Sequence, residues 1–365
     1  MQTPDYLNRI HELQHLLPQS YIDAFLIDDP INLFYLTGLD LSAGRLLVHN
    51  EGAHLLVDSR YFEQAQQHAP FLTIHLAPPH TLSILLASPE CSYIQRLGFN
   101  SDKTSYKSFL DLQVIVTTLY TEHRMLALCP VDNLTKDLRH RKDATEIAIL
   151  KEAARLGSEG YDFLLSLLVE GVSEADLAME LEIFWRRRGA SGVAFSPIIA
   201  FGANSSMPHY RAGNARLKQG DLVLIDIGVT YQHYHSDMTR VAFFGEPKEE
   251  LRHIYDVVKQ AQQAALALCR PGILIGELDQ AAREVIGECG YGDKFTHSLG
   301  HGIGLEVHEW PTVRNAAPQG EVVLEEGMVI TIEPGVYVSG LGGVRLEDTI
   351  LIIADGHESL TQRPI

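Results

Sequence analysis

Cysteine is scarce in this sequence, and no two cysteines lie close together along the chain. Four occur among the 365 residues, at Cys91, Cys129, Cys269 and Cys289. Zinc knuckles and redox-active pairs need thiols that are only a few residues apart, so this spacing indicates neither. We therefore expect buried, reduced thiols in a protein of a reducing compartment.

Positive charge is also in short supply. The 29 Lys and Arg residues stand against 47 Asp and Glu residues, which leaves a formal net charge of −18. Nucleic acids and anionic membrane surfaces are bound through basic patches. The charge balance therefore argues against both as the main partner and favours an acidic surface that keeps the protein in solution.

Long hydrophobic runs are missing as well. No apolar run reaches the ~20 residues that a membrane-spanning helix requires. The N-terminal segment, MQTPDYLNRIHELQHLLPQS, is polar and periodic, whereas a secretory signal has a basic segment followed by an apolar one. We expect a cytoplasmic protein without a membrane partner.

The remaining composition is typical of a globular protein with two domains, since 45% of the 365 residues are hydrophobic and 21% are charged. In the first part of the chain, predicted strands alternate with predicted helices, which indicates an α/β domain. Asp58, Arg60 and Tyr61 follow one of these strands, and we expect a structural role for them. The predicted helices cover residues 7–17, 61–67 and 105–110, and the predicted strands cover 24–27, 45–49, 53–57, 72–75 and 113–117.

A domain boundary is predicted where Pro130 and the charged stretch NLTKDLRHRKD interrupt the pattern. We therefore divide the chain into an N-terminal domain, 1–125, a linker, 126–142, and a C-terminal domain, 143–365. The C-terminal domain should begin with a long amphipathic helix over 144–168. Ser173 is expected to cap the next helix.

Two pairs of acidic residues lie in otherwise apolar strands of the C-terminal domain. Asp226 and Asp237 are brought together by a turn near residues 232–234, and Glu333 and Glu347 flank a glycine-rich turn. Carboxylates in apolar surroundings repel one another and resist desolvation. Unless some remain protonated, they need a cation.

His301 completes this set in the segment HSLGHGIGLEVHEWP. Four carboxylates and one imidazole balance the charge of two divalent ions. A set of oxygen ligands with one nitrogen suits Mn²⁺, Co²⁺, Fe²⁺ or Zn²⁺. Paired ions of this kind lower the pKa of a shared water and polarise a carbonyl, as metal-dependent hydrolases require. Chance carboxylates in an acidic α/β protein are the less probable interpretation.

Four segments of this region, GHGIGLEVHE, TIEPGVYV, GGVRLED and DIGVTYQHYHSDMTR, resemble the pita-bread metallopeptidases. This group includes Xaa-Pro aminopeptidase, prolidase, methionine aminopeptidase and creatinase. The segments NLFYLTGLDLSAGRLLV and HLLVDSRYFEQA are similar to the creatinase-type N-terminal domain of the proline-specific members. The resemblance thus implies a creatinase-like α/β domain followed by a pita-bread catalytic domain.

The resemblance also implies a role for each residue of the site. Asp226 chelates one metal, Asp237 and Glu347 bridge two metals, and a bridging hydroxide attacks the substrate. The other implied assignments are His301 and Glu333 as ligands, His209, His308 and Glu333 as catalytic residues, and His297, Tyr337 and Arg345 as substrate-binding residues. Ile227, Val229 and His233 stand where Phe, Ala and Gly are common in the family.

The implied activity is metal-dependent hydrolysis of the Xaa-Pro peptide bond, with Mn²⁺ as the expected metal. We lean towards an aminopeptidase that accepts peptides with proline second, and keep a dipeptidase (prolidase) as the alternative. Methionine aminopeptidase usually lacks the N-terminal domain. A metal-free binding module or a creatinase-like hydrolase would have lost ligand positions. A homodimer is expected, with the N-terminal domain helping to cover the partner's site.

Overall fold

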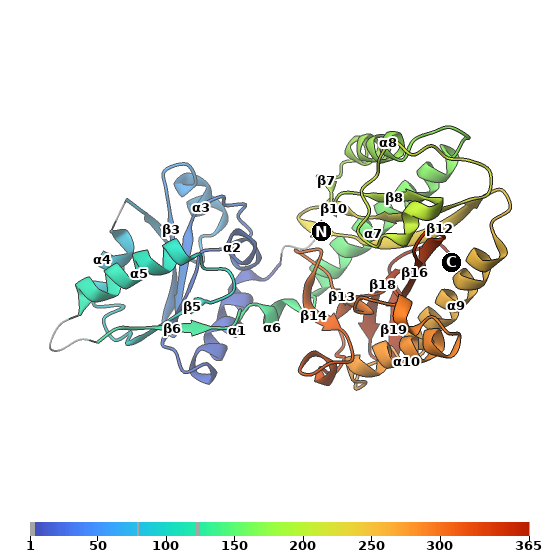
Figure 1. The fold of residues 1–365 in the computed structure, drawn as a ribbon. Helices are drawn as coiled ribbons and strands as arrows, with labels where there is room; N and C mark the ends of the chain where they lie inside the picture. The colour runs from blue at the N-terminus through green and yellow to red at the C-terminus, as the bar shows by residue number, and fades with distance from the viewer. Residues whose placement is uncertain (1–3, 79, 121–124, 365) are drawn as a thin grey trace. The chain divides into compact units, whose positions relative to one another are not determined.

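The computed structural model describes residues 4–78, 80–120 and 125–364 (Figure 1). The chain forms two compact units, Met1–Arg139 and His140–Ile365. Buried hydrophobic clusters of the described residues lie within each unit, so each unit has a core of its own. Within the described residues, no helix combines the length and the apolar character needed to cross a membrane.

The first unit is built on a mixed six-stranded sheet with the order β4-β3-β2-β1-β5-β6. The β2–β3 hairpin and the β1–β2 pair are antiparallel, whereas the pairs β3–β4, β1–β5 and β5–β6 are parallel. The strands are β1 (Ala24–Ile27), β2 (Arg45–His49), β3 (Gly52–Val57), β4 (Thr73–Leu76), β5 (Arg96–Asn100) and β6 (Ala127–Val131).

The helices of the first unit begin at residues suited to capping. Asp5, Asp29 and Ser105 accept hydrogen bonds from backbone N–H groups in the first turns of α1, α2 and α5, which satisfies donors that lack a partner in the helix. The helices are α1 (Tyr6–Gln19), α2 (Pro30–Thr37), α3 (Phe62–His68), α4 (Thr81–Ala87), α5 (Tyr106–Leu119) and α6 (Lys136–Arg139).

The strand predicted over residues 113–117 is wrong, because this segment lies inside helix α5. Its β-branched residues suggested a strand, yet the cap at Ser105 starts a helix that continues through them. The hydroxyls of Thr117 and Thr118 donate to the carbonyls of Gln113 and Val114, each at 2.8 Å. These bonds, one turn back, accommodate threonine in a helix.

The predicted linker, 126–142, is not an extended connection. It contains β6, which pairs with β5 in the sheet, and the short helix α6. The polar stretch was interpreted as solvent-exposed, but Asn133 and Thr135 are buried and bonded to each other at 2.5 Å. The Nδ2 group of Asn32 also donates to Asn133 Oδ1, at 3.2 Å. Mutual hydrogen bonding lets these polar groups be buried.

Two helix pairs support the second unit. Helices α7 (Ala144–Ser166) and α8 (Glu174–Arg187) begin at Asp143, which forms a capping box with Glu146, and at Ser173, which accepts from Asp176 N–H. Helices α9 (Glu249–Leu266) and α10 (Ile275–Glu288) contribute buried residues to one hydrophobic cluster of the second unit. Figure 1 shows α7 and α8 beside β7, β8 and β10, and α9 and α10 beside the strands of the C-terminal part.

The strands of the second unit form four small sheets, ordered β11-β10-β7, β12-β9-β8, β14-β13-β15-β18-β19 and β16-β17. Their bounds are β7 (Gly192–Val193), β8 (Ile198–Phe201), β9 (Asp221–Ile227), β10 (Val229–Tyr231), β11 (Tyr234–His235), β12 (Met238–Phe244), β13 (Gly300–Gly302), β14 (Glu309–Val313), β15 (Val329–Ile332), β16 (Gly335–Val338), β17 (Gly342–Arg345), β18 (Asp348–Ile353) and β19 (Gly356–Ser359). Short 3₁₀ turns cover Gly202–Ser206, Gly292–Lys294 and Gln319–Glu321.

Candidate metal centre

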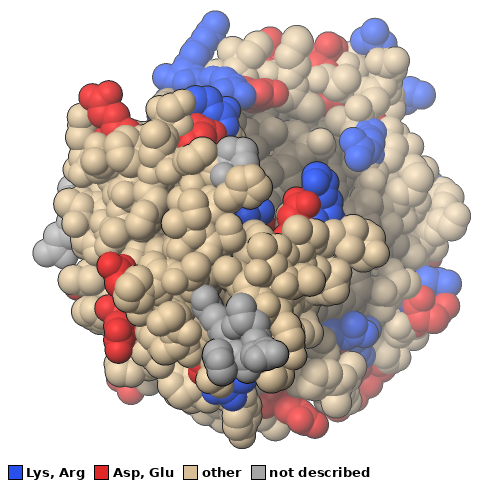
Figure 2. Space-filling model, turned by 90° about the vertical axis from the view of Figure 1, so that its left-hand side faces the viewer, with Lys and Arg blue, Asp and Glu red and all other residues tan. Residues whose placement is uncertain are grey.

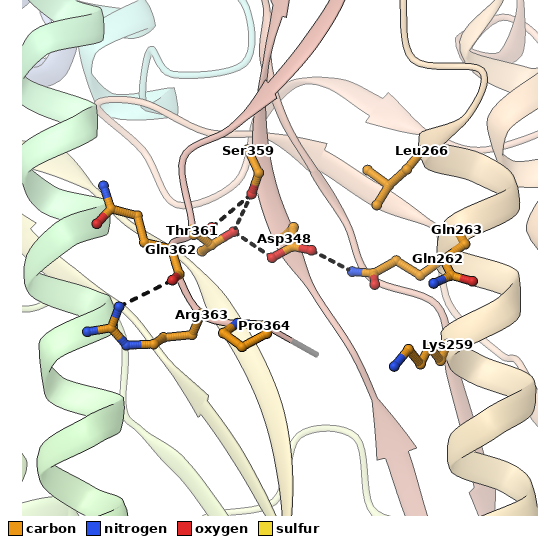
Figure 3. Close-up of a pocket in the computed structure, with 10 residues that line it drawn as sticks. All are labelled: Lys259, Gln262, Gln263, Leu266, Asp348, Ser359, Thr361, Gln362, Arg363 and Pro364. Atoms are coloured by element: carbon orange, nitrogen blue, oxygen red, sulfur yellow. Dashed lines mark hydrogen bonds between the residues drawn. The ribbon is translucent and has the colours of Figure 1, made fainter.

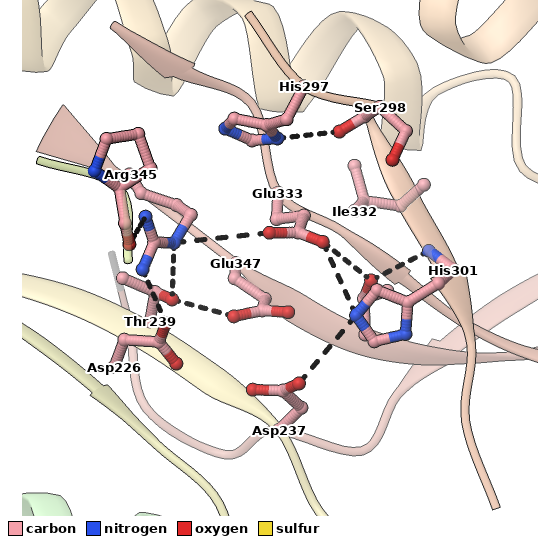
Figure 4. A network of polar contacts seen from close by, with 12 residues as sticks. Asp226, Asp237, Thr239, His297, Ser298, His301, Ile332, Glu333, Arg345 and Glu347 are labelled. Atoms are coloured by element: carbon pink, nitrogen blue, oxygen red, sulfur yellow. Dashed lines mark hydrogen bonds and ion pairs between the residues drawn. The ribbon is translucent and has the colours of Figure 1, made fainter. Parts of the chain in front are cut away.

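The five predicted ligands lie together at the ends of four strands and within one more (Figure 4). Asp226 is near the end of β9 and Asp237 directly precedes β12. Glu333 directly follows β15, and Glu347 directly precedes β18. His301 is the central residue of β13. All five line one cavity of about 520 Å³ in the second unit.

Strand pairing brings these residues together from distant parts of the sequence. Strands β9 and β12 are antiparallel, with Asp226 opposite Thr239, and β15 and β18 are antiparallel, with Ile332 opposite Asp348. The two strand pairs meet where Glu347 N–H donates to the Thr239 carbonyl at 3.1 Å. The Thr239 hydroxyl donates to Glu347 Oε2 at 2.7 Å.

The imidazole of His301 is held with Nε2 towards the acids. Its Nδ1 lies 3.0 Å from the Gly302 carbonyl, which only accepts, so Nδ1 carries the proton. The Nε2 atom lies 3.4 Å from Glu333 Oε1 and 3.8 Å from Asp237 Oδ2. Ligand atoms of Asp237, His301 and Glu347 all lie within 4.8 Å of one another. One cation could contact all three.

The electrostatics of the acids show what such a cation would stabilise. Burial and then the charge of Glu347 raise the pKa of Asp237 and of Glu333 well above their ordinary values. Burial and then Asp226 raise the pKa of Glu347 to about 8. Burial and the neighbouring His308 lower the pKa of His301 to about 4. The centre thus favours neutral carboxyls and a neutral imidazole unless a cation is bound.

Three buried carboxylate oxygens of this centre have no hydrogen-bond donor among the described residues. They are Asp226 Oδ1, Asp237 Oδ1 and Glu347 Oε1. A buried acceptor without a partner loses the free energy of its hydration, so such atoms are uncommon in proteins. With the lone pair of His301 they form an oxygen-rich ligand set that fits divalent metal ions.

A second polar network borders the acids. Arg345 Nη2 donates to Asp226 Oδ2, Nε donates to Thr239 Oγ1 at 3.2 Å, and Nη1 donates to the Tyr337 hydroxyl at 2.8 Å. That hydroxyl lies 2.9 Å from His297 Nε2. Burial raises the pKa of Tyr337 to about 12, so the hydroxyl keeps its proton and donates it to His297. His297 and Arg345 line the cavity, whereas Tyr337 is not among its lining residues.

The two remaining predicted catalytic histidines also line the cavity. The ring of His308 packs edge-on against that of His301, with 4.3 Å between the centroids. Burial, and then His209, lower the pKa of His308, so its imidazole is neutral near neutral pH. Of the ten predicted site residues, nine thus line one cavity, and Tyr337 is the exception.

Comparison with known proteins agrees with this geometry. Residues 148–354 match the family described as Metallopeptidase family M24, and residues 9–141 match the Creatinase/Prolidase N-terminal domain. The M24 match covers more than half of the chain. The protein belongs to metallopeptidase family M24. Its catalytic unit accordingly has the pita-bread fold and follows a creatinase-type N-terminal domain.

Several relatives of this M24 peptidase match over almost the full length. The Xaa-Pro dipeptidase of Pyrococcus furiosus is 37% identical over 97% of each chain. The structure of an Xaa-Pro dipeptidase from Bacillus anthracis is 34% identical, covering 99% of this chain and 98% of that one, with a TM-score of 0.91. An X-Pro aminopeptidase from Thermotoga maritima is 32% identical, covering 97% and 98%, with a TM-score of 0.85.

Some residues of the M24 peptidase site were not singled out from the sequence. Thr239 bonds both Glu347 and Arg345, and Thr331 Oγ1 accepts from His301 N–H at 3.1 Å. Arg211 and Phe195 line the cavity. Thr239 lies two residues after Asp237, and Thr331 lies two residues before Glu333. This spacing places each threonine on the same face of the chain as its neighbouring acid, but the contacts of Thr239 are with residues distant in sequence.

The departure from the family pattern at His233 affects a turn and not the cavity. Gln232 and His233 have φ of 47° and 70° and connect β10 to β11. Two left-handed residues are typical of a tight hairpin turn, where glycine is the usual choice. His233 is exposed and is not among the residues that line the cavity.

A second cavity in the catalytic unit has different chemistry (Figure 3). Its volume is about 500 Å³, and Lys259, Gln262 and Asp348 are among its lining residues. Asp348 accepts from Gln262 Nε2 at 3.2 Å and from Thr361 Oγ1 at 2.6 Å. Its carboxylate is thus already bonded within the protein, so this cavity has no comparable metal-ligand set.

Proposed function

We propose that this M24 peptidase is an Xaa-Pro dipeptidase that uses two divalent metal ions, with Mn²⁺ as the preferred ion. The observation that carries the proposal is the grouping of ligand atoms of Asp237, His301 and Glu347 within 4.8 Å of one another. In the same cavity, one buried oxygen each of Asp226, Asp237 and Glu347 has no hydrogen-bond donor among the described residues. Near-full-length relatives that carry the name Xaa-Pro dipeptidase support the dipeptidase over the aminopeptidase towards which the sequence leaned.

Asp226, Asp237, His301, Glu333 and Glu347 would hold the metal ions. When bound, divalent ions polarise the scissile carbonyl and lower the pKa of water. They would also bring the raised carboxyl pKa values of Asp237, Glu333 and Glu347 down, because a nearby positive charge favours the carboxylate form.

Glu333 is the proposed proton carrier. The nitrogen of an Xaa-Pro bond carries no hydrogen and must be protonated before the proline leaves. In the carboxylate form that bound metal ions favour, Glu333 could accept the proton released from the attacking water and deliver it to the prolyl nitrogen. The Thr331 hydroxyl, 3.5 Å from Glu333 Oε1, helps to orient the carboxyl group.

His308 and His209 are the proposed stabilisers of the oxyanion. Both line the cavity, and a neutral imidazole can donate one N–H to a developing negative charge without carrying a full charge of its own. The hydrogen bonds from Arg345 to Tyr337 and between Tyr337 and His297 hold these three side chains in place. Phe195, Ile198 and Val307 add apolar surface for a proline ring.

Arg211 supports the choice of a dipeptide. An Xaa-Pro dipeptide has a free carboxylate on its proline, and a cation at the cavity would recognise it. Arg211 lines the cavity, is exposed, and makes no ion pair within the described part of the chain. Arg345 is less suited to this role because it already bonds Asp226.

Hydrolysis of Xaa-Pro and of Xaa-Pro-Yaa, each with Mn²⁺, Co²⁺ and Zn²⁺, tests the dipeptidase assignment. We expect the dipeptide to be cleaved and the tripeptide to be cleaved at least about 100-fold more slowly in kcat/KM, which corresponds to about 3 kcal/mol. Efficient cleavage of the tripeptide would establish the aminopeptidase instead. Arg211→Gln should raise the KM for the dipeptide but not for its amide, which lacks the carboxylate.

Substitution of the ligands tests the metal assignment separately. We expect Asp237→Ala and Glu347→Ala to lose bound Mn²⁺ and to lose hydrolysis, because each removes an acid at the centre of the set. Asp256→Asn, an exposed acid on α9, is the matched control and should retain both. Full activity in either of the first two variants would rule out the proposed centre.

A further inference from the structure

A second cluster of metal-ligand types lies in the first unit, away from the catalytic residues in sequence and in chemistry. His49 ends β2, His54 is in β3, and Cys91 follows α4. Their exposed fractions are 2%, 4% and 0%. One possible ligand atom from each, two imidazole nitrogens and the thiol sulfur, lies within 4.8 Å of the other two.

The two imidazoles face each other through the same type of nitrogen. His49 Nε2 and His54 Nε2 are 2.9 Å apart, and the rings are stacked at 10°. The outer nitrogens have partners of their own: His49 Nδ1 lies 2.8 Å from the Tyr93 hydroxyl, and His54 Nδ1 lies 3.0 Å from His75 Nε2. If both outer nitrogens donate, both Nε2 lone pairs point at one place, and a proton or a cation must lie there.

The outer contacts match those of metal-binding histidines. A ligating imidazole commonly donates its second N–H to a neighbouring acceptor, which fixes the ring and its tautomer. The Tyr93 hydroxyl and His75 Nε2 could accept in this way from His49 and His54, although the Glu51 N–H also lies 3.4 Å from His49 Nδ1. The hairpin that carries both ligands is short, because β2 ends at His49 and β3 begins at Gly52.

The atoms also have a spacing that zinc can use. Zinc bound at about 2.0–2.1 Å from nitrogen and about 2.3 Å from sulfur holds neighbouring ligands roughly 3.3–3.6 Å apart. A small outward movement from the 2.9 Å contact would bring the two nitrogens to that separation. Glu90 Oε2 lies 3.9 Å from His54 Nε2, and its side chain is 70% exposed, so it can move to supply a fourth ligand.

We propose that His49, His54 and Cys91, with Glu90 as the fourth ligand, bind one Zn²⁺ ion that ties the β2–β3 hairpin to the segment after α4. Nitrogen and thiolate ligands favour Zn²⁺, whereas the oxygen-rich catalytic set suits Mn²⁺. The thiolate and the carboxylate together balance the charge of the ion. The alternative occupant of the same place is a proton shared between the two imidazoles.

Cobalt substitution separates this site from the catalytic one. A thiolate bound to Co²⁺ gives an intense charge-transfer absorption in the near ultraviolet, and none of the five catalytic ligands contains sulfur. We expect metal-stripped full-length protein to develop this band on titration with Co²⁺, and one equivalent of Zn²⁺ to abolish it. The Cys91→Ser variant should lose the band and one equivalent of bound metal while it retains dipeptide hydrolysis.

Matched variants make the result decisive. Cys269→Ser, which removes another buried thiol, should keep the band, and His54→Gln should lose it even if Cys91→Ser does not fold. Circular dichroism checks the fold of each variant. Absence of the band in wild-type protein, or its persistence in His54→Gln, would overturn the zinc site and leave the shared proton. The outcome is independent of the catalytic assignment, because activity and the band are read separately.

Discussion

Arg345 shows how single residues set the charge balance of the catalytic centre. Its guanidinium bonds Asp226 Oδ2, while Asp226 Oδ1 has no donor among the described residues. One oxygen of this acid is therefore committed to the protein and the other remains available to a metal ion. The same arginine bonds Thr239, which in turn bonds Glu347, so it orients two ligands at once.

His308 offers a way to separate metal binding from chemistry at the scale of one residue. His308 lines the cavity but is not one of the five proposed ligands. We expect His308→Ala to retain full Mn²⁺ content and to lower kcat by about 100-fold, the loss typical of one removed oxyanion donor. Metal analysis and steady-state kinetics measure both effects. His253→Ala, an exposed histidine on α9, is the control, and unchanged turnover in His308→Ala would exclude the assigned role.

His297 should make the metal-free protein sensitive to acid. Burial lowers its pKa from 6.5 to about 4 in the folded protein. On acidification, the imidazole of the unfolded chain is therefore protonated at a higher pH than that of the folded protein. The free energy of unfolding falls as the pH decreases from 6.5 towards about 4. The contribution lost between about pH 7 and about pH 5 is about 2 kcal/mol.

Urea unfolding of metal-free wild-type protein and of His297→Asn at these two pH values measures this contribution. The variant should be less stable at the higher pH, because it loses the bond to Tyr337. Its stability should also fall less on acidification. An identical fall in the two proteins would show that His297 is protonated equally in the folded and unfolded states.

Residue identity and position were enough to single out the four acids among the five proposed ligands, because acids within apolar strands are uncommon and require a reason. The structure brings these five side chains to one cavity. The partners Thr239 and Glu174 could not be singled out in this way. Their roles depend on contacts with residues distant in sequence, such as Thr239 with Glu347 and Glu174 with Tyr210. Threonine and glutamate have many ordinary roles, so composition gives no hint of such contacts.

At the scale of elements, helix α8 holds the segment that carries His209. Its first residue, Glu174, is fully buried and accepts four hydrogen bonds from the segment 201–213. The donors are Phe201 N at 2.8 Å, Asn204 Nδ2 at 3.0 Å, Tyr210 Oη at 2.8 Å and Gly213 N at 3.1 Å. One carboxylate thus joins the start of a helix to both ends of a loop at the cavity.

Removal of this carboxylate should loosen the loop. Glu174→Ala leaves several buried donors without an acceptor, so we expect a loss of about 3 kcal/mol in stability. Displacement of His209 should lower kcat/KM for the dipeptide by about 10- to 100-fold. Urea unfolding, kinetics and hydrogen exchange of residues 201–213 measure these effects. Glu180→Ala, an exposed acid on the same helix, should change none of them.

Most elements could be predicted from periodicity, and the exceptions have a common cause. The strands around Asp226 and the helices α7 to α10 follow clear apolar patterns. Residues 113–117 were predicted as a strand but lie in helix α5. Their β-branched side chains favour strands, yet such residues also occur in helices when a cap and contacts with a sheet support them. In the segment 126–142, the polar residues Asn133 and Thr135 are buried and bonded to each other. Burial of mutually bonded polar groups is not visible in a pattern of hydrophobicity.

At the scale of the molecule, helix α5 carries an apolar stripe that faces solvent. The first unit exposes large apolar side chains on α5, with Tyr106 at 75%, Leu110 at 41% and Val114 at 66%. These residues recur every fourth position and form one stripe along the helix. Figure 2 shows a face on which uncharged side chains predominate, with acidic and basic groups scattered among them. We expect the exposed apolar stripe on α5 to contact another protein.

The predicted homodimer can be tested on this stripe. We expect wild-type protein to sediment as a dimer and Val114→Glu to sediment as a monomer, because a charge in an apolar interface must be desolvated. Ser108→Glu adds the same charge on the opposite side of α5, where it completes a capping box with Ser105, and should remain dimeric.

If the N-terminal domain of one copy helps to cover the site of the other, the monomeric variant should also lose dipeptidase activity while its bound Mn²⁺ stays unchanged. A wild-type monomer with full activity would refute both the dimer and this role, whereas a dimer that persists in Val114→Glu would place the interface elsewhere.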